Sequence, residues 1–193
     1  MKMSDIRKFF YAAITIFPIG VFAIKLVSAE FNFRAKLPII LCVAAICMCA
    51  AEDLISRTIP DFLNAAIFLS GISFTLFTKG IRSAAFATLK AGIFFIILII
   101  IFHISKGGIG GGDIKLVAAS SAFIGPMNAV WITAFAAMLA SPLGVFLIIK
   151  KRCRAKDNKK TEQPLTLPFG PFYAICFLSE LCSFFNNAVI TLQ

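Results

Sequence analysis

The sequence predicts an all-α, polytopic membrane protein with about six to seven transmembrane helices. Hydrophobic residues make up 60% of the 193-residue chain, whereas charged residues make up only 15%. A water-soluble domain of this length cannot hide so much apolar surface in its core. We therefore expect residues 1–193 to form a single integral-membrane domain in contact with the lipid bilayer.

Seven apolar segments follow one another along the chain, most of them near the roughly 20 residues that a spanning helix needs. The segments are Phe9–Ala29, Leu37–Ala51, Phe62–Phe77, Phe86–Ile104, Ile114–Ile124, Ala129–Ile149 and Phe169–Ile190. The second ends just before Glu52 and Asp53, and the fourth ends at a run of glycines. The fifth is short and ends at Gly125-Pro126, so we expect it to be tilted, covered by protein, or continuous with those glycines.

The first segment has two interpretations. Lys2, Arg7 and Lys8 precede it, and it ends in Val27-Ser28-Ala29, a pattern that a cleaved signal peptide also shows. The segment is long, however, and Lys25 lies just before the apparent cleavage site. We therefore expect a retained first helix with a snorkelling lysine, with a cleaved signal peptide as the alternative.

The basic residues predict the orientation of these segments. With seven alternating crossings, 13 of the 19 Lys and Arg residues lie on the side of the N-terminus and six on the other. Because cytoplasmic loops carry the excess of Lys and Arg, the N-terminus is predicted to be cytoplasmic. Asp53 and Asp113, 60 residues apart, then both emerge at the cytoplasmic face.

The net charge of +10 and the six cysteines have simple explanations. The basic residues lie between apolar segments, where they contact anionic headgroups, and no soluble basic domain is present to bind nucleic acid. The cysteines include no Cys-x-x-Cys pair, so we expect small buried side chains rather than a zinc site or a disulfide framework. We expect neither a metal nor another cofactor.

Asp53 and Asp113 are the candidate catalytic residues. An acid at full depth in the bilayer costs roughly 2 to 3 kcal/mol, so an acid at the membrane boundary indicates function. Two carboxyls within a few ångströms cannot both ionise, and such a pair activates water for hydrolysis of an amide bond. A proton- or ion-coupled transporter that uses the same paired aspartates is the alternative.

Glycines immediately before Asp113 favour the peptidase. Gly107, Gly108 and Gly110–Gly112 carry no side chains, which lets an extended substrate backbone approach the acid. A phosphate-binding loop is excluded because no Gly-Lys-Ser or Gly-Lys-Thr follows. A plain flexible turn stays open as the simplest explanation of this run.

Three nearby polar residues have structural interpretations. Asp61 follows Pro60 and is expected to cap the third helix rather than to catalyse. Lys115 lies on another face of its helix from Asp113, so a structural or headgroup role is expected. His103 is the only histidine in the chain and is expected to be structural.

Three motifs in this order resemble the type IV prepilin peptidases, membrane aspartyl proteases with a Gly-x-Gly-Asp motif. Gly110-Gly111-Gly112-Asp113-Ile114-Lys115 matches that motif with its trailing lysine. Asp53, followed by Ile59-Pro60-Asp61, is similar to the first catalytic aspartate and its Ile-Pro-Asp element. Leu167-Pro168-Phe169-Gly170-Pro171 is similar to the Pro-Phe-Gly-Pro element that opens the last helix.

The resemblance implies that Asp53 and Asp113 are the catalytic pair of a prepilin leader peptidase. The substrate would be a prepilin or pseudopilin precursor, cut after its basic leader at the cytoplasmic face of a bacterial inner membrane. It also implies substrate-binding residues, which are Gly110, Gly111, Gly112, Lys115, Pro168, Phe169, Gly170 and Pro171. Homo-oligomerisation stays open.

The sequence also departs from the longer members of this family. Those members carry a cysteine-rich zinc-binding insertion and also N-methylate the trimmed substrate. Here only about seven residues separate the first two segments, and no Cys-x-x-Cys pair exists. We therefore expect a compact form without methyltransferase activity, similar to the peptidases of tight-adherence pilus systems.

Overall fold

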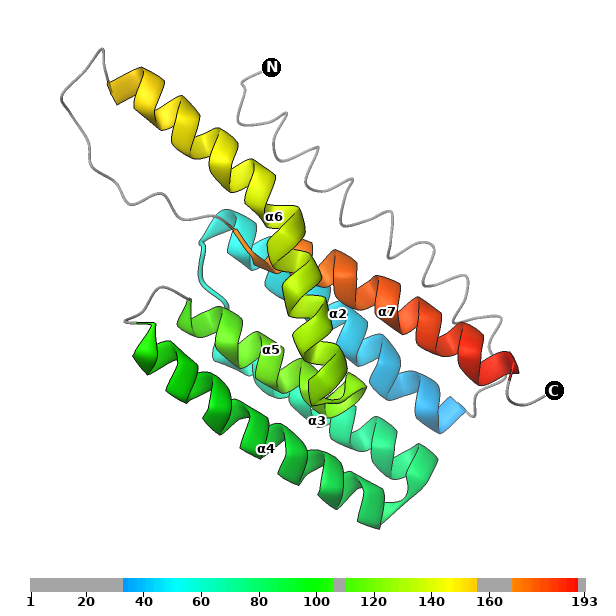
Figure 1. Cartoon of the computed structure of the whole chain (residues 1–193). Coiled ribbons are helices and arrows are strands. Elements are labelled where there is room, and N and C mark those ends of the chain that lie inside the picture. The colour runs from blue at the N-terminus through cyan, green and yellow to red at the C-terminus, as the bar shows by residue number, and fades with distance from the viewer. Residues whose placement is uncertain (1–32, 106–109, 156–167, 191–193) are drawn as a thin grey trace.

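The computed structural model describes residues 33–105, 110–155 and 168–190, and their regular structure is helical throughout (Figure 1). The helices are α2 (Phe33–Ile55), α3 (Asp61–Lys79), α4 (Ile81–Ile104), α5 (Gly111–Ile124), α6 (Pro126–Ala155) and α7 (Gly170–Ile190). Each corresponds to one of the last six predicted segments, so the all-α prediction is confirmed. The first predicted segment, Phe9–Ala29, lies outside the described residues, as do Gly107 and Gly108.

Four of these helices are long and apolar enough to cross a membrane. They are α2 over Ala35–Ile55, α3, α4, and α6 over Pro126–Phe146. The apolar part of α7 within the described residues, Gly170–Phe184, is shorter, and α5 has only 14 residues. The chain is thus a polytopic membrane protein.

Some helices extend beyond the ends of the predicted apolar segments, because a helix can continue through polar residues. The second segment was predicted to end at Ala51, but α2 continues to Ile55, so Asp53 is helical. The fourth was predicted from Phe86, but α4 begins at Ile81, directly after a reversal at Gly80 with φ 82°. Glycine adopts this left-handed geometry without a steric penalty, so one residue is enough to join α3 to α4.

The start of α6 shows the same effect. The sixth segment was predicted from Ala129, but α6 begins at Pro126, after Gly125 with φ 86°. Proline suits the first position of a helix because its φ is already helical and its missing N–H has no partner there. The helix α5 therefore ends, and α6 begins, within two residues.

The short helix α5 lies inside the bundle. It packs against α3, α4 and α6, and its buried residues are Ile114 and every residue from Leu116 to Ala122. Figure 1 shows that α5 stops short of the far end of α3 and α4. Of the alternatives considered for the fifth segment, the structure supports coverage by protein.

Close approach of α3 to α5 depends on a glycine in α3. A Cβ atom on Gly71 would lie 2.7 Å from the backbone nitrogen of Phe123. Next to this contact, the rings of Phe74 and Phe123 stack with centroids 4.7 Å apart. The two backbones can therefore touch only because residue 71 has no side chain.

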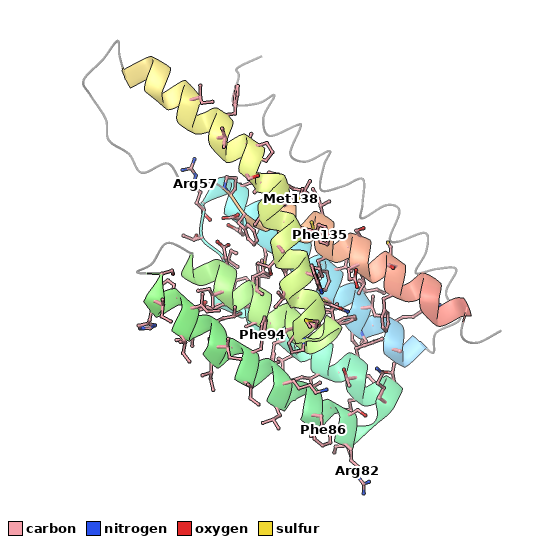
Figure 2. All side chains as sticks on the ribbon, viewed as in Figure 1. Arg57, Arg82, Phe86, Phe94, Phe135 and Met138 are labelled. Carbon is pink, nitrogen blue, oxygen red and sulfur yellow. The ribbon has the colours of Figure 1, made fainter. Side chains whose placement is uncertain are left out.

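The outer surface of the bundle is apolar, as a lipid-facing surface must be. Phe86 on α4 and Phe135 and Met138 on α6 are all well exposed, whereas Phe94 on α4 is buried (Figure 2). An exposed apolar surface of this extent marks contact with lipid or with another protein. Arg57 and Arg82 lie at opposite ends of the bundle, so its two ends are distinguishable in Figure 2.

The contact at Gly71 yields a prediction about stability. Gly71→Ala should lower the free energy of unfolding by about 1 to 3 kcal/mol, because the new methyl group forces α3 away from α5. Thermal unfolding in detergent measures the change. Gly92→Ala on α4 is the control, since no atom lies within 4 Å of its added Cβ. Equal melting temperatures for the two variants would contradict the close packing of α3 on α5.

Candidate active site

Asp53 lies in the last turn of α2 and is only 7% exposed. The N–H of Gly170, the first residue of α7, donates a hydrogen bond to Asp53 Oδ2 at 2.7 Å. A Cβ on Gly170 would lie 3.0 Å from both Cβ and Oδ2 of Asp53, so a side chain at position 170 would displace the Asp53 side chain by a few tenths of an ångström. Burial disfavours the ionised form of Asp53, and the positive end of the α7 dipole and this N–H oppose that effect.

The chain turns sharply after Asp53. The N–H of Arg57 donates to the Asp53 carbonyl oxygen at 3.2 Å, and Arg57 adopts a positive φ of 57°. This geometry is uncommon for a residue with a side chain. Ile59 and Pro60 then lead into α3. The turn ends α2 just beyond its acid and brings the start of α3 alongside α5.

Asp113 lies in the first turn of α5, where Gly110 is the N-cap residue. The Asp113 N–H donates to the Gly110 carbonyl oxygen at 3.1 Å. A Cβ on Gly110 would lie 2.7 Å from Asp113 Oδ2, because side chains in a helix tilt back toward its N-terminus. Gly110 is therefore the glycine that makes room for this carboxyl.

Gly112, which directly precedes Asp113, has different surroundings. A Cβ on Gly112 would meet only the side chain of Ile59, at an ordinary 3.4 Å. Among the described glycines, positive φ values occur at Gly80 and Gly125 and not at Gly112. A Cβ on Gly111 would have no neighbour within 4 Å.

The two acids interact electrostatically. Asp113 precedes the apolar segment of α5, and its pKa is raised to about 6, first by burial and then by the nearby charge of Asp53. The C-terminal end of α2 and the N-terminal ends of α5 and α7 lie at the same end of the bundle (Figure 1). The structure therefore brings together the two acids that the sequence singled out.

Lys115 and Asp61 form an ion pair beside this pair of acids. The Lys115 ammonium contacts both carboxylate oxygens of Asp61, at 2.7 and 2.9 Å. The prediction that Asp61 caps α3 is wrong, because Pro60 occupies the N-cap position and Asp61 is the first helical residue. The pair joins the first turns of α3 and α5 but is largely exposed, so its contribution to stability is below about 1 kcal/mol.

Two buried residues near the acids were not singled out from the sequence. The Tyr173 hydroxyl, on α7, hydrogen-bonds to the Ser120 hydroxyl on α5, and both residues are fully buried. A serine pair, Ser120-Ser121, inside an otherwise apolar segment was the available signal. Its meaning depends on which helix packs opposite, and the sequence alone does not show that.

A sequence profile of the type IV leader peptidase family matches residues 39–149, more than half of the chain. The chain belongs to this family. The match includes Asp53, Asp113 and the glycines before Asp113, and it ends before Pro168. The resemblance inferred from the three motifs is thereby confirmed at the level of the family.

Two curated relatives are prepilin leader peptidase/N-methyltransferases from two strains of Burkholderia pseudomallei. Each is 30% identical over 138 residues, which is 69% of this chain and 42% of the relative. The chain thus spans less than half the length of the relatives it matches. No solved structure matches the chain.

His103 and the cysteines are the other side chains of a type that can bind a metal. Within residues 33–105, 110–155 and 168–190, no group of three or more His, Cys, Asp and Glu residues gathers in one place. The His103 ring nitrogen Nδ1 lies 3.0 Å from the Ile99 carbonyl oxygen. Cys42 and Cys49 are free and buried, as expected for small core residues, and Cys47, Cys176 and Cys182 are free and half-buried.

The close contact between Gly110 and Asp113 yields a prediction about activity. Gly110→Ala should lower leader-peptide cleavage by about 10- to 100-fold, because the new methyl group displaces the Asp113 carboxyl. Gly92→Ala on α4, outside the proposed site, is the control and should stay near wild type, because its methyl group meets open space. The assay uses a prepilin in detergent, normalised to folded enzyme. Equal activity of the two variants would show that Gly110 does not position Asp113.

Proposed function

We propose that this chain is an aspartyl endopeptidase that removes the basic leader from a prepilin or pseudopilin precursor, with Asp53 and Asp113 as its catalytic pair. The observation that carries the proposal is the placement of these two acids at one end of the bundle, where burial and then the charge of Asp53 raise the pKa of Asp113. Membership of the leader peptidase family supports the substrate class.

The surroundings of the two acids suggest different roles. Burial disfavours the charge of Asp53, but Asp53 accepts the Gly170 N–H at the positive end of α7, and this contact offsets part of that cost. Burial and the neighbouring charge favour the protonated form of Asp113. At the start of the reaction, Asp53 is therefore the general base and Asp113 the general acid.

These roles describe a complete hydrolysis. Asp53 takes a proton from water, and the water oxygen bonds to the scissile carbonyl carbon while Asp113 gives its proton to the carbonyl oxygen. The tetrahedral intermediate then collapses: Asp113 takes back a hydroxyl proton, the C–N bond breaks, and the leaving amine receives the proton held by Asp53. No covalent link to the enzyme forms, and both acids return to their initial protonation states.

A glycine lies against each carboxyl of the pair. Gly110 borders Asp113 and Gly170 borders Asp53, so neither of these two neighbours adds a side chain beside the acids. We propose that an extended peptide passes between them, with the remaining residues of Gly110–Gly112 and Pro168–Pro171 and the Lys115 side chain along its path. An extended backbone needs such open edges because it approaches the acids directly.

The transporter alternative fits the placement of the acids less well. A coupling site for ions is expected near the middle of the membrane, at the interface of an inverted repeat. Asp53 lies in the last turn of α2 and Asp113 in the first turn of α5, so both lie at helix ends. This position favours a reaction at the membrane boundary.

We further propose that the acids face the cytoplasm across a bacterial inner membrane. Asp53 and Arg57 lie at the same end of the bundle, and 13 of the 19 Lys and Arg residues fall on that side of the predicted topology. The proposal covers the peptidase reaction, because the family match concerns leader peptidases, and we expect no N-methyl transfer because the sequence has no Cys-x-x-Cys pair.

Substitution of either acid tests the proposed function. Asp53→Asn and Asp113→Asn should each abolish cleavage of a purified prepilin while the protein stays folded in detergent, because each removes one half of the proton-sharing pair. Mass spectrometry of the product reports the cleavage site and shows an unmethylated N-terminus. Full cleavage by either variant, or no cleavage of any prepilin by the wild type, would contradict the proposal.

Thiol labelling tests the orientation. In a background without native cysteines, Ser56→Cys at the active-site end should react with a membrane-impermeant reagent only from the cytoplasmic side. Arg82→Cys, at the opposite end of the bundle, is the matched position and should react only from outside intact cells. The reverse pattern would overturn the orientation without affecting the identity of the catalytic pair.

A further inference from the structure

Helix α7 makes polar contacts with both helices that carry the catalytic acids. Its first residue, Gly170, donates its N–H to Asp53 on α2. Three residues later on α7, the Tyr173 hydroxyl hydrogen-bonds to Ser120 on α5. Residues three apart lie on the same side of a helix, so one face of α7 reaches both partners.

The contact between Tyr173 and Ser120 has a definite direction. Ser120 Oγ donates its own proton to the Val117 carbonyl oxygen at 2.9 Å. The Tyr173 O–H is therefore the donor to Ser120. Both residues are 0% exposed, so solvent reaches neither hydroxyl. Loss of the Tyr173 hydroxyl leaves Ser120 with its bond to Val117, whereas loss of the Ser120 hydroxyl removes the acceptor of the buried Tyr173 O–H.

Tyr173 is held firmly at its other end. Its ring packs between Phe169 and Phe177, with ring centroids 5.9 and 6.4 Å away. Its N–H also donates to the Phe169 carbonyl oxygen at 3.1 Å. Packing within α7 therefore orients the Tyr173 side chain, and Ser120 on α5 lies where the hydroxyl reaches it.

The same contact determines how far α5 lies from α7. Within the described helices, the backbones that pack closely on α7 are those of α2 and α6, not α5. Side chains make the link to α5: the hydrogen bond from Tyr173 to Ser120 and the edge contact of Phe177 with Phe123, whose ring centroids are 6.4 Å apart. The length of the tyrosine side chain thus acts as a spacer between the two helices.

The contact between Tyr173 and Ser120 lies about two turns of α5 away from Asp113. Ser120 follows Asp113 by seven residues, so the two residues lie on nearly the same face of α5. We propose that Tyr173 is a positioning residue for the peptidase reaction: through Ser120 it sets the distance of Asp113 from Asp53, which α7 holds through Gly170. This inference rests on the proposed function, and Tyr173 itself does not contact the reacting atoms.

Removal of one oxygen atom tests the proposal. Tyr173→Phe keeps the ring and loses the hydroxyl, so kcat for prepilin cleavage should fall about tenfold, because Asp113 is displaced from Asp53. Ser120→Ala should have a similar effect. The double variant should be no worse than either single one, because both remove the same contact.

The pH profile separates positioning from a general loss of stability. Cleavage by the wild type declines on the alkaline side as Asp113 loses its proton. If Asp113 moves away from the charge of Asp53, the pKa of Asp113 falls. The alkaline decline in activity should therefore occur at lower pH in Tyr173→Phe than in the wild type. The carboxyl ¹³C shift of Asp113 in isotope-labelled protein reports the same pKa without any substrate.

Ser121→Ala is the matched control. Ser121 is the adjacent buried serine and donates within its own helix, to the Ala118 carbonyl oxygen at 2.6 Å. It should keep the wild-type kcat and pH profile. If Tyr173→Phe does not fold, Ser120→Ala provides the same test.

The outcomes distinguish the two proposals. A wild type that cleaves, with Tyr173→Phe equal to it in kcat and in the pKa of Asp113, overturns the positioning role alone. An equal effect of Ser120→Ala and Ser121→Ala also overturns it. A wild type that cleaves no prepilin overturns the proposed function, whereas a lowered pKa of Asp113 in Tyr173→Phe still supports the spacer.

Discussion

The hydrogen bond from the Gly170 N–H to Asp53 is the contact on which the site depends. It places a buried carboxylate at the positive end of α7 and joins the end of α2 to the start of the last helix. An ionised carboxylate buried without such a donor would be costly. The contact is close because residue 170 is a glycine, since an added Cβ there would lie 3.0 Å from the Asp53 side chain.

Asp113, the second acid, is positioned by the packing of its helix rather than by a single hydrogen bond. Asp113 begins a helix of only 14 residues that is surrounded by other helices, so its place follows from how those neighbours pack. Gly71 lets α3 touch α5, the Lys115 ammonium joins the first turns of the same two helices, and Ser120 receives the hydroxyl from α7. Because helix interiors are close-packed, these contacts together allow α5 little freedom to shift.

The differences from the sequence-based expectations have local causes. The sequence did not distinguish among the glycines before Asp113, and Gly110 borders the Asp113 carboxyl because of where α5 begins within that run. Asp61 was expected to cap a helix, but Pro60 takes that position and Asp61 pairs with Lys115. Apolar segments mark the part of a helix that crosses lipid, whereas hydrogen bonding and packing decide where the helix ends.

The sequence by itself determined the all-α membrane class, the last six helices, the two acids and the family, because hydrophobic length, charge distribution and short motifs are local properties of a chain. Only the tertiary structure decided which atoms surround those acids. Gly170 lies 117 positions from Asp53, and Tyr173 lies 53 positions from Ser120. Contacts over such separations depend on how helices rotate and pack against one another, and no local pattern records that arrangement.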